Sequence, residues 1–473
     1  MADSRFAAIR LYIRKRWPFP KKIPLLLIVF LISLFLSNLF GSEEISVQAN
    51  HALFLLLFAA GLWITEAIPP FAVSILIIGF SIYFLDDIQF SVISKDWQKY
   101  ISTWSSPIIW ILLGGFFLAM GAQITQFDRK FSRYVLQRFG TNPYIILLGC
   151  MLVTGLLSMF MSNTATTAMM VTILIPIVND LDKDDPFVKA LFLGVAAAAT
   201  VGGMGTVIGS PPNAIALGVI QNNGVNFGFL EWMMIGMPVA MILIFLIWLL
   251  LKSFYRTKYQ SIELSDNGDH HAYPNRNTVS SRRIVVITFM LTIGLWLTSP
   301  LHNIPVALVS FLPILILTVS GVVLAEDLRL VPWDTLILVA GGLTLGIVIS
   351  DSGLADFLVG KIPVLDNIYV MLIILGLLTA TLSNIMSNTA AASVLIPVGA
   401  SFLPDHVLMV AVVIGLSAST ALFLPISTPP NAIAYSSGFL KQSDFRFVGL
   451  VAGLAGPVII LVLTEVLMSF WPM

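Results

Sequence analysis

Long apolar runs, separated by short polar stretches, follow one another along almost the whole chain. A helix needs about 20 predominantly apolar residues to cross the hydrocarbon core of a bilayer. Short segments of alternating polarity, which are typical of membrane β-barrels, do not dominate. The pattern therefore predicts an all-α polytopic membrane protein with about 11 transmembrane helices. We place them near 23–40, 51–68, 71–86, 104–126, from 187 onward, 229–253, 283–300, 304–323, 334–350, 406–437 and 447–470.

The apolar segment Tyr144–Ile177 suits neither one span nor two. As one helix it would be roughly 50 Å long, which is too long for a single span, and as two full spans its arms are short. We therefore predict a re-entrant hairpin at about 142–180, with Ser162-Asn163-Thr164 at its tip. A second hairpin is expected at about 367–404, around Ser387-Asn388-Thr389. Irregular backbone at membrane depth is tolerated only where it is buried in protein or lines a wet cavity.

Several phrases occur twice and in the same order, which indicates a duplicated domain. Met161-Ser162-Asn163-Thr164-Ala165 returns letter for letter at 386–390, and Pro211-Pro212-Asn213-Ala214-Ile215-Ala216 returns at 429–434. Proline removes a backbone donor and clashes with the preceding turn, so the helices that contain these Pro-Pro pairs must break. We predict four regions: 1–50 (a cytoplasmic segment and the first helix), 51–254 (first repeat), 255–282 (cytoplasmic linker loop) and 283–473 (second repeat).

The charge distribution predicts the orientation, because Lys and Arg gather on cytoplasmic loops. The basic segment 1–22 is expected inside, as is the basic, amphipathic stretch 128–140, which suits a helix lying on the membrane surface. The acidic loop 41–50 and the C-terminus are expected outside. The loop 180–189 is expected inside although it is mostly acidic, so it does not support this orientation. Five spans per repeat invert the second repeat, so the two hairpin tips can meet near the midplane.

Composition narrows the class of protein further. The chain is 58% hydrophobic and 11% charged, whereas a soluble domain carries about 25% charged residues. The formal net charge is zero, so no nucleic-acid partner is expected. Because Cys150 is the single cysteine, no internal disulfide can form. No acid–base pair and no nucleophile–histidine pair stands out in the sequence, so we do not expect an enzyme. Glu66 ends the second helix and is a weaker candidate ligand, because a helix-ending role suits it equally well.

The repeated tips carry hydroxyls, amides and opened backbone, and no basic residue. Hydroxyl and amide groups donate to an anion without formal charge, and helix N-termini add partial positive charge. Opened carbonyls can hold Na⁺ beside that anion. Ser, Asn and Thr also cap broken helices. One copy alone suits capping as well as binding, whereas two identical copies favour a binding site, and the two roles are compatible.

At these residues the chain resembles the divalent anion/sodium symporters, the family that includes the INDY-type dicarboxylate transporters. The likeness runs from the second helix to nearly the end. It rests on Trp63-Ile64-Thr65-Glu66-Ala67-Ile68-Pro69, on both Ser-Asn-Thr tips, and on Gly209-Ser210-Pro211-Pro212-Asn213 and Ser427-Thr428-Pro429-Pro430-Asn431. The resemblance implies a homodimer in which a transport domain carries both hairpins through a scaffold like an elevator.

The resemblance also implies the ligand sets. Substrate carboxylates would be held by Asn163, Thr164, Ser387, Asn388 and Thr389, with Thr428 and Pro429 alongside. One sodium ion would be held by Ser158, Ser162, Asn163 and Gly209, and a second by Ser383, Met386, Asn388 and Ser427, partly through backbone carbonyls. Ser383 and Ser210 stand where relatives are expected to carry threonine, and both retain a hydroxyl.

These observations predict a sodium-coupled symporter of a bacterial-type plasma membrane that imports C4-dicarboxylates such as succinate, malate or fumarate. Alternatives of the same fold are a sodium-independent dicarboxylate exchanger and a sulfate or tricarboxylate carrier. An anion channel or a membrane sensor represents a different class. Two opposed hairpins favour alternating access over a continuous pore, and a sensor usually carries an added soluble domain.

Overall fold

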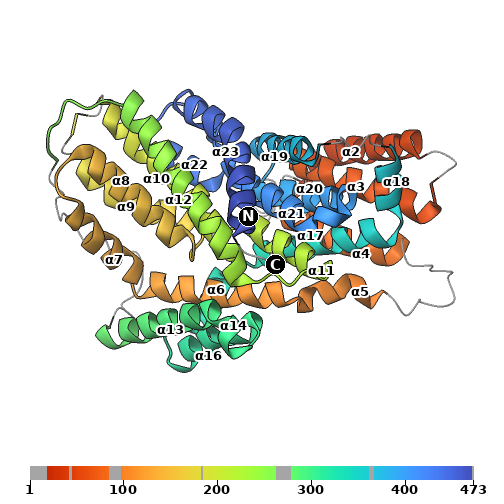
Figure 1. Cartoon of the computed structure of the whole chain (residues 1–473), viewed down its shortest axis with the longest axis horizontal. Helices are drawn as coiled ribbons and strands as arrows, with labels where there is room; N and C mark the ends of the chain where they lie inside the picture. Colours follow the sequence, from red (N-terminus) through yellow and green to blue (C-terminus); the bar gives the residue numbers. More distant parts are fainter. Residues whose placement is uncertain are drawn as a thin grey trace, which may run out of the picture.

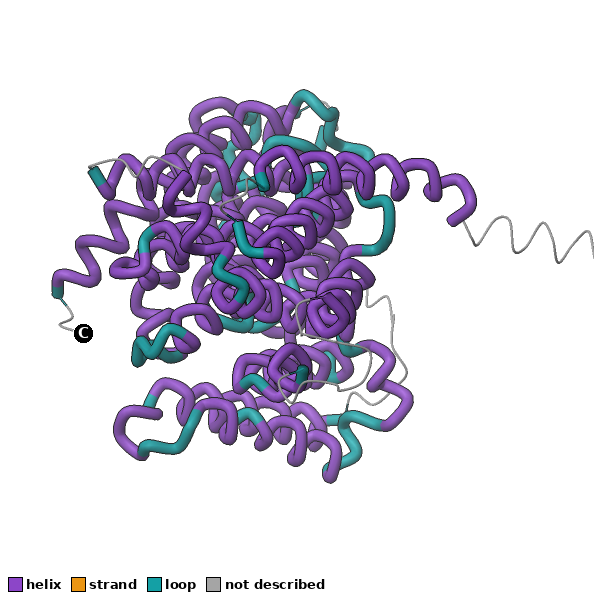
Figure 2. Tube along the Cα trace, turned by 90° about the vertical axis from the view of Figure 1, so that its right-hand side faces the viewer, coloured by secondary structure: helices purple, strands orange, loops and turns teal. Residues whose placement is uncertain are grey.

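A computed structural model describes residues 19–41, 45–84, 97–179, 181–182, 185–262, 278–361 and 367–470. Helices form nearly all of this part of the chain, and no strand occurs within it (Figures 1 and 2). The prediction of an all-α protein is therefore confirmed. The basic start of the chain and the last three residues lie outside the described ranges.

The first half contains α2 (Phe19–Phe40), α3 (Val47–Thr65), α4 (Pro70–Phe84), α5 (Gln98–Ile101), α6 (Pro107–Ile124), α7 (Phe127–Leu136), α8 (Pro143–Ser158), α9 (Asn163–Asn179), α10 (Pro186–Gly202), α11 (Pro211–Asn222) and α12 (Phe229–Phe254). The second half contains α13 (Val279–Leu297), α14 (Ser299–His302), α15 (Val306–Val309), α16 (Phe311–Val319), α17 (Trp333–Asp351), α18 (Leu354–Lys361), α19 (Ile368–Ile385), α20 (Asn388–Phe402), α21 (Val407–Ser417), α22 (Pro429–Ser436) and α23 (Asp444–Ser469). Short 3-10 turns extend several of them, among them η3 (Gly203–Gly205) after α10 and η6 (Ala418–Thr420) after α21.

Nine helices of the described ranges are long and apolar enough to cross a membrane, or up to ten if a bent pair counts as one. The bent pair is Asn388–Phe402 with Pro404–Thr420, which meet at 116°. Two of the expected spans coincide with apolar helices of 10–17 residues, Pro70–Tyr83 and Val306–Val319, and are not among the nine. The order of elements from α3 to α12 recurs from α13 to α23, with a hairpin and then a broken helix in each half. The predicted amphipathic helix is present as α7, which buries Asp128, Ser132 and Leu136.

The helices pack in distinguishable groups. In Figure 1, α13, α14 and α16 lie in a layer below α6, and Figure 2 shows that this layer stays at the lower edge when the molecule is turned. A second group gathers α2, α3, α4, α17 and α18 around its own buried cluster, which includes Leu62, Trp63 and Ile77. A third group contains the hairpins and broken helices, α8–α12 and α19–α23.

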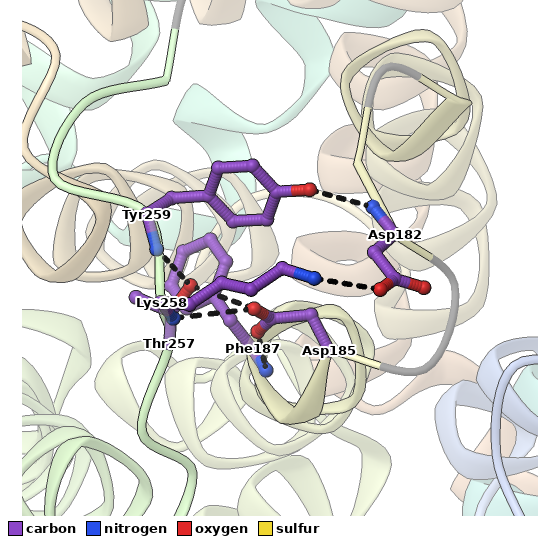
Figure 3. Close-up of polar contacts among 6 residues, drawn as sticks. All are labelled: Asp182, Asp185, Phe187, Thr257, Lys258 and Tyr259. Carbon is purple, nitrogen blue, oxygen red and sulfur yellow. Dashed lines mark hydrogen bonds and ion pairs between the residues drawn. The ribbon is translucent and has the colours of Figure 1, made fainter.

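The segment that follows α12 is fastened to the first hairpin and to α10 (Figure 3). Lys258 Nζ lies 2.7 Å from an Asp182 carboxylate oxygen, and this hydrogen bond raises the pKa of Lys258. Thr257 Oγ1 donates to Asp185 Oδ2 at 3.1 Å, while Asp185 Oδ1 accepts from the Phe187 backbone and caps α10. The acidic loop between α9 and α10 is therefore partly neutralised by the chain itself.

Candidate functional site

Each Ser-Asn-Thr phrase lies where a hairpin turns and its second helix begins. The first hairpin turns after α8, and α9 starts at Asn163. The second turns after α19, and α20 starts at Asn388. Ser162 Oγ accepts a hydrogen bond from Ala165 N at 3.3 Å, and Ser387 Oγ accepts one from Ala390 N at 3.2 Å. Both serines cap a helix through their oxygen, which leaves the hydroxyl hydrogen available to a bound anion.

The Pro-Pro-Asn phrases hold open the breaks in the two broken helices. Asn213 Nδ2 donates to the carbonyl oxygens of Gly203 and Thr206, at 2.8 and 2.7 Å. In the second half, Asn431 Nδ2 donates to the carbonyl oxygens of Leu422 and Leu424, at 3.3 and 3.0 Å. Each asparagine thus gives a hydrogen-bond donor to carbonyl oxygens of the unwound segment in front of its Pro-Pro pair. The unwound segment in front of each Pro-Pro pair is fixed by this arrangement.

One cavity of about 400 Å³ brings both tips and both breaks together. All seven residues predicted to hold substrate line it: Asn163, Thr164, Ser387, Asn388, Thr389, Thr428 and Pro429. Of the predicted cation ligands, Ser162, Gly209 and Ser427 also line it, whereas Ser158, Ser383 and Met386 are buried in the protein. Glu66 is exposed at the end of α3 and does not line this cavity. Residues more than 200 positions apart in the sequence therefore share one site.

Several helices begin at this cavity. The first residues of α4, α9, α11, α20 and α22 line it, as does Asp334 in the first turn of α17. The N-terminus of a helix carries partial positive charge and unsatisfied N–H groups, so it favours an anion. The far walls are apolar and include Leu112, Phe116 and Leu338. The cavity therefore suits a small anion that is held without a basic side chain.

A group of oxygen atoms surrounds the amide of Asn163. One terminal atom of this amide lies 2.6 Å from Ser158 Oγ, 3.1 Å from the Gly209 carbonyl oxygen and 3.2 Å from the Ala199 carbonyl oxygen. In the absence of a cation the amide nitrogen suits this place, because it can donate. With a cation among these oxygens, the amide oxygen can turn toward it and become a further ligand. These atoms belong to residues of the first predicted sodium set, and their arrangement suits a bound cation.

Gly209 is required for the close approach of these oxygens. A Cβ at this position would lie 2.5 Å from the Gly203 carbonyl oxygen and 3.0 Å from those of Ser158 and Met159. Any side chain would therefore push apart the backbone that supplies the carbonyl oxygens. This observation gives Gly209 a physical role beside the cation set.

The second predicted sodium set contains oxygen atoms that lack a partner. Ser383 Oγ and Asn388 Oδ1 are buried, and neither finds a hydrogen-bond partner among the described residues. Ser427 Oγ accepts from Leu424 N at 2.9 Å and donates to Asn384 Oδ1 at 2.8 Å. Leaving a buried polar atom without a hydrogen-bond partner costs about 1–3 kcal/mol of free energy. Such oxygens are available as ligands, so the residue types of this set suit a bound cation.

Asn384 is a site residue that the sequence analysis missed. Its Oδ1 accepts from Phe423 N at 2.9 Å as well as from Ser427, and its Nδ2 donates to the Ala380 carbonyl oxygen at 2.8 Å. One amide thus joins the second hairpin to the second broken helix. The matching position of the first repeat is Met159, whose backbone carbonyl accepts a hydrogen bond from Thr206 Oγ1. Comparing the two repeats does not reveal Asn384, because each half joins its hairpin to its broken helix through a different group, a side-chain amide in one and a backbone carbonyl in the other.

Replacing Asn384 by alanine is expected to raise the sodium concentration needed for half-maximal uptake about tenfold. The change removes the hydrogen bonds from Phe423 N–H and the Ser427 hydroxyl, each worth about 0.5–1.5 kcal/mol net, and their sum corresponds to roughly tenfold or more in affinity. Uptake by purified protein in vesicles, measured across sodium concentrations, checks this. Asn367→Ala is the control, since Asn367 caps the outer end of α19 away from the cavity. An unchanged sodium response in Asn384→Ala would contradict the role given to Asn384.

Asp334 is the second residue that sequence analysis missed, and it is the only charged side chain among the described residues lining the cavity. It lies in the first turn of α17, where the helix dipole stabilises a carboxylate. A fixed negative charge at the cavity raises the free energy of a bound dianion. Interactions of this kind are worth about 1 kcal/mol in water at contact distances and weaken as salt rises.

Removing this charge in Asp334→Asn is expected to lower the half-saturating concentration of a dianionic substrate several-fold, and more strongly at low ionic strength. Asp351→Asn is the matched control, because Asp351 lies at the other end of the same helix and pairs with Lys99 at 2.8 Å. Uptake kinetics at two salt concentrations measure the effect. A higher half-saturating concentration in Asp334→Asn would show that this carboxylate helps to bind a cation instead.

Comparisons with known proteins identify relatives across most of the chain. A family model described as "Citrate transporter" matches residues 60–415. A sodium-dependent dicarboxylate transporter, SdcS of Staphylococcus saprophyticus, is 30% identical over 92% of this chain and 88% of its own length. An uncharacterized transporter of Haemophilus influenzae is 31% identical over 87% of this chain and 90% of its own.

A solved structure extends the comparison to the fold. The YdaH transporter of Alcanivorax borkumensis aligns with a TM-score of 0.52 over 86% of this chain and 99% of its own, at 14% sequence identity. At this identity the match speaks for the fold alone. It agrees with a polytopic membrane transporter.

Proposed function

Since the chain belongs to the divalent anion/sodium symporter family, we propose that it is a sodium-coupled symporter that imports C4-dicarboxylates such as succinate, malate and fumarate. The assignment as a multi-pass membrane transporter of dicarboxylates rests on its relatives. The observation that supports the proposed symport of C4-dicarboxylates is the shared cavity lined by both Ser-Asn-Thr tips. Two tips with equivalent donors match two carboxylates of one substrate. A volume of about 400 Å³ lies within the roughly 300–1,000 Å³ of small-molecule sites.

Sodium coupling is supported by the two groups of oxygen atoms beside the tips. Neither tip offers a Lys or Arg to balance a dianion, whereas each adjoins oxygens that suit a cation. Asn163 and Asn388 belong to both the anion and the cation sets, so each ion lowers the free energy of binding the other. Two sodium ions would balance a dicarboxylate, and a third would make transport electrogenic.

A tricarboxylate is the second candidate substrate, because the matching family model is described as a citrate transporter. Purified protein in proteoliposomes separates the candidates. Uptake of labelled succinate under an inward sodium gradient should be suppressed by unlabelled malate and fumarate, and much less by citrate or sulfate. Suppression by citrate alone would assign the tricarboxylate. Uptake that needs internal dicarboxylate and no sodium would assign the exchanger.

We further propose that the hairpins and broken helices, α8–α12 and α19–α23, move together as an elevator. The cavity supports this, since its tips come from this group and its other walls come from α4, α6 and α17. Substrate held between two bodies can be carried as one body slides on the other. The peripheral layer α13–α16 exposes Ile287, Met290 and Leu308, and it is where we propose the homodimer contact.

The orientation proposed for this inner-membrane protein places the N-terminus in the cytoplasm and the C-terminus outside. Cysteines at Val47 and Ser261, both exposed, should then label from opposite faces in a Cys150→Ala background. An impermeant thiol reagent applied to intact cells should modify only the Val47 position. Labelling of both positions from outside would overturn the orientation.

A further inference from the structure

A second cavity, of about 290 Å³, lies between α12 and α23, apart from the tips. In Figure 1 these two long helices run beside each other across the middle of the molecule, and they pack directly. The walls are almost entirely apolar; they carry small residues on α23 (Ala452, Ala455 and Gly456) and larger ones on α12 (Leu243, Leu246 and Ile247). The small side chains of α23 leave the space that the cavity fills.

The cavity opens onto a surface that faces lipid. Both helices are long and apolar enough to span a membrane, and less than half of each is buried in the protein. Large apolar side chains are exposed on both sides of the opening, with Leu246 and Leu249 on α12 and Leu454 and Val458 on α23. In a multi-pass membrane protein such a continuous apolar surface contacts the acyl chains of the bilayer. The cavity is an inward extension of that contact surface.

We propose that this cavity is a binding site for one acyl chain of a bilayer phospholipid. An empty apolar cavity loses dispersion contacts along its whole lining, and acyl chains are the molecules that surround its opening. Among the described residues that line the cavity, only Ser253 and Thr420 are polar. Both hydroxyls already donate to carbonyls of their own helical segments, so the lining gives no reason for water to enter. An extended hydrocarbon chain matches both the shape between two helices and the apolar walls.

The inner wall of the cavity joins the transport machinery. It includes Val201 and Thr420, which stand at the ends of the two helices that unwind before the Pro-Pro-Asn phrases. A Cβ on Gly456 would lie 2.6 Å from Thr420 Cγ2, and one on Gly449 would lie 2.2 Å from Phe423 Cα. The helix α23 therefore supports the second unwound segment by direct contact.

The helix α12 supports the first unwound segment in the same way. A Cβ on Gly236 would lie 2.3 Å from the Met204 carbonyl oxygen, and Trp232 Nε1 donates to that oxygen at 3.0 Å. An acyl chain between α12 and α23 thus fills the space between the two helices that pack against the unwound segments. The bound chain maintains the distance between α12 and α23, and this distance in turn maintains the geometry of both unwound segments.

The experiment uses the full chain in proteoliposomes made with a phospholipid that carries a photoactivatable diazirine on one acyl chain. Irradiation followed by peptide mass spectrometry should place the label on residues that line the cavity, such as Leu250 and Ile459. The variant Ala455→Trp fills the cavity and should remove most of this labelling, because the indole then occupies the space that the acyl chain would take. The milder Ala455→Leu should give an intermediate loss if the tryptophan variant folds poorly.

The matched control is Val458→Trp, which adds the same side chain to the exposed face of α23 outside the cavity. It should leave the labelling of the cavity residues unchanged. Equal labelling in wild type, Ala455→Trp and Val458→Trp would overturn the proposal, because it would show only chance contact with bulk lipid. Label on a neighbouring copy of the chain in place of these residues would also overturn it, since a second copy would then cover the cavity. Photolabelling of the cavity residues and labelling of a neighbouring copy are both measured without the transported substrate, so this test is independent of the proposed function.

Discussion

Replacing Asn163 or Asn388 by alanine is expected to reduce sodium-driven uptake by about a hundredfold or more, the largest loss among the site residues. The Asn163 amide lines the cavity and contacts Ser158 and the Gly209 carbonyl. Asn388 lines the same cavity, and its buried Oδ1 has no hydrogen-bond partner among the described residues. In the proposed binding sets, each substitution removes a contact to the anion and one to a cation. At roughly 1.5–3 kcal/mol for a hydrogen bond to a charged group, two such losses exceed a factor of a hundred. Initial uptake rates and the sodium dependence measure both parts.

The two hairpins supply matched controls for these substitutions. Asn142 caps α8 and Asn367 caps α19, each through an oxygen that accepts two backbone N–H groups at the outer end of its hairpin. Alanine there removes a helix cap, worth about 0.5–2 kcal/mol of stability, without touching the cavity. The control variants should melt at lower temperature but keep their sodium response. If Asn142→Ala impaired uptake as strongly as Asn163→Ala, the loss would belong to hairpin stability and not to binding.

Replacing Thr164 or Thr389 by alanine is expected to raise the half-saturating dicarboxylate concentration about tenfold to a hundredfold. Both threonines line the cavity one residue into α9 and α20, and each offers one hydroxyl to the anion. Losing one hydrogen bond to a charged group costs about 1.5–3 kcal/mol. Similar losses from two residues in different repeats would support one substrate held by both tips. Uptake measured across succinate concentrations at saturating sodium checks the expectation.

Thr172→Ala and Thr381→Ala are the controls for these two variants. Both threonines are exposed, and each donates only to a carbonyl of its own helix, that of Met169 at 2.6 Å and that of Leu377 at 2.8 Å. They should transport like the wild type. Normal transport by well-folded Thr164→Ala and Thr389→Ala proteins would mean that the tips only cap helices and that substrate binds elsewhere.

The repeated phrases made the candidate site predictable. A polar phrase inside an apolar run has few stable places, and its recurrence in both halves links the two copies to one structure. The structure places both tips and both Pro-Pro-Asn breaks at one cavity, as the sequence led us to expect. The capping role and the cavity-lining position of Ser162 and Ser387 occur together, which agrees with the view that the two roles are compatible.

Other features depended on contacts that no local pattern encodes. Asn384 meets Phe423 and Ser427 across about forty residues of chain, and its repeat counterpart Met159 uses a backbone oxygen that every residue possesses. The sequence around Asp334 does not mark it as a site residue, because its position at the cavity depends on how α17 packs beside the tips. The span expected at 304–323 is shorter in the structure, where its helices start only after Pro305 and end at Val319.

The most direct test of sodium coupling at this site is the initial rate of labelled succinate uptake into proteoliposomes as external sodium varies, with choline keeping the ionic strength constant. The two oxygen clusters beside the tips predict a steep rise with a Hill coefficient above one. They also predict a weaker sodium response in Asn163→Ala and in Asn388→Ala. Equal uptake in choline and in sodium would contradict the account, because the dianion would then bind without the cations that these clusters are proposed to hold.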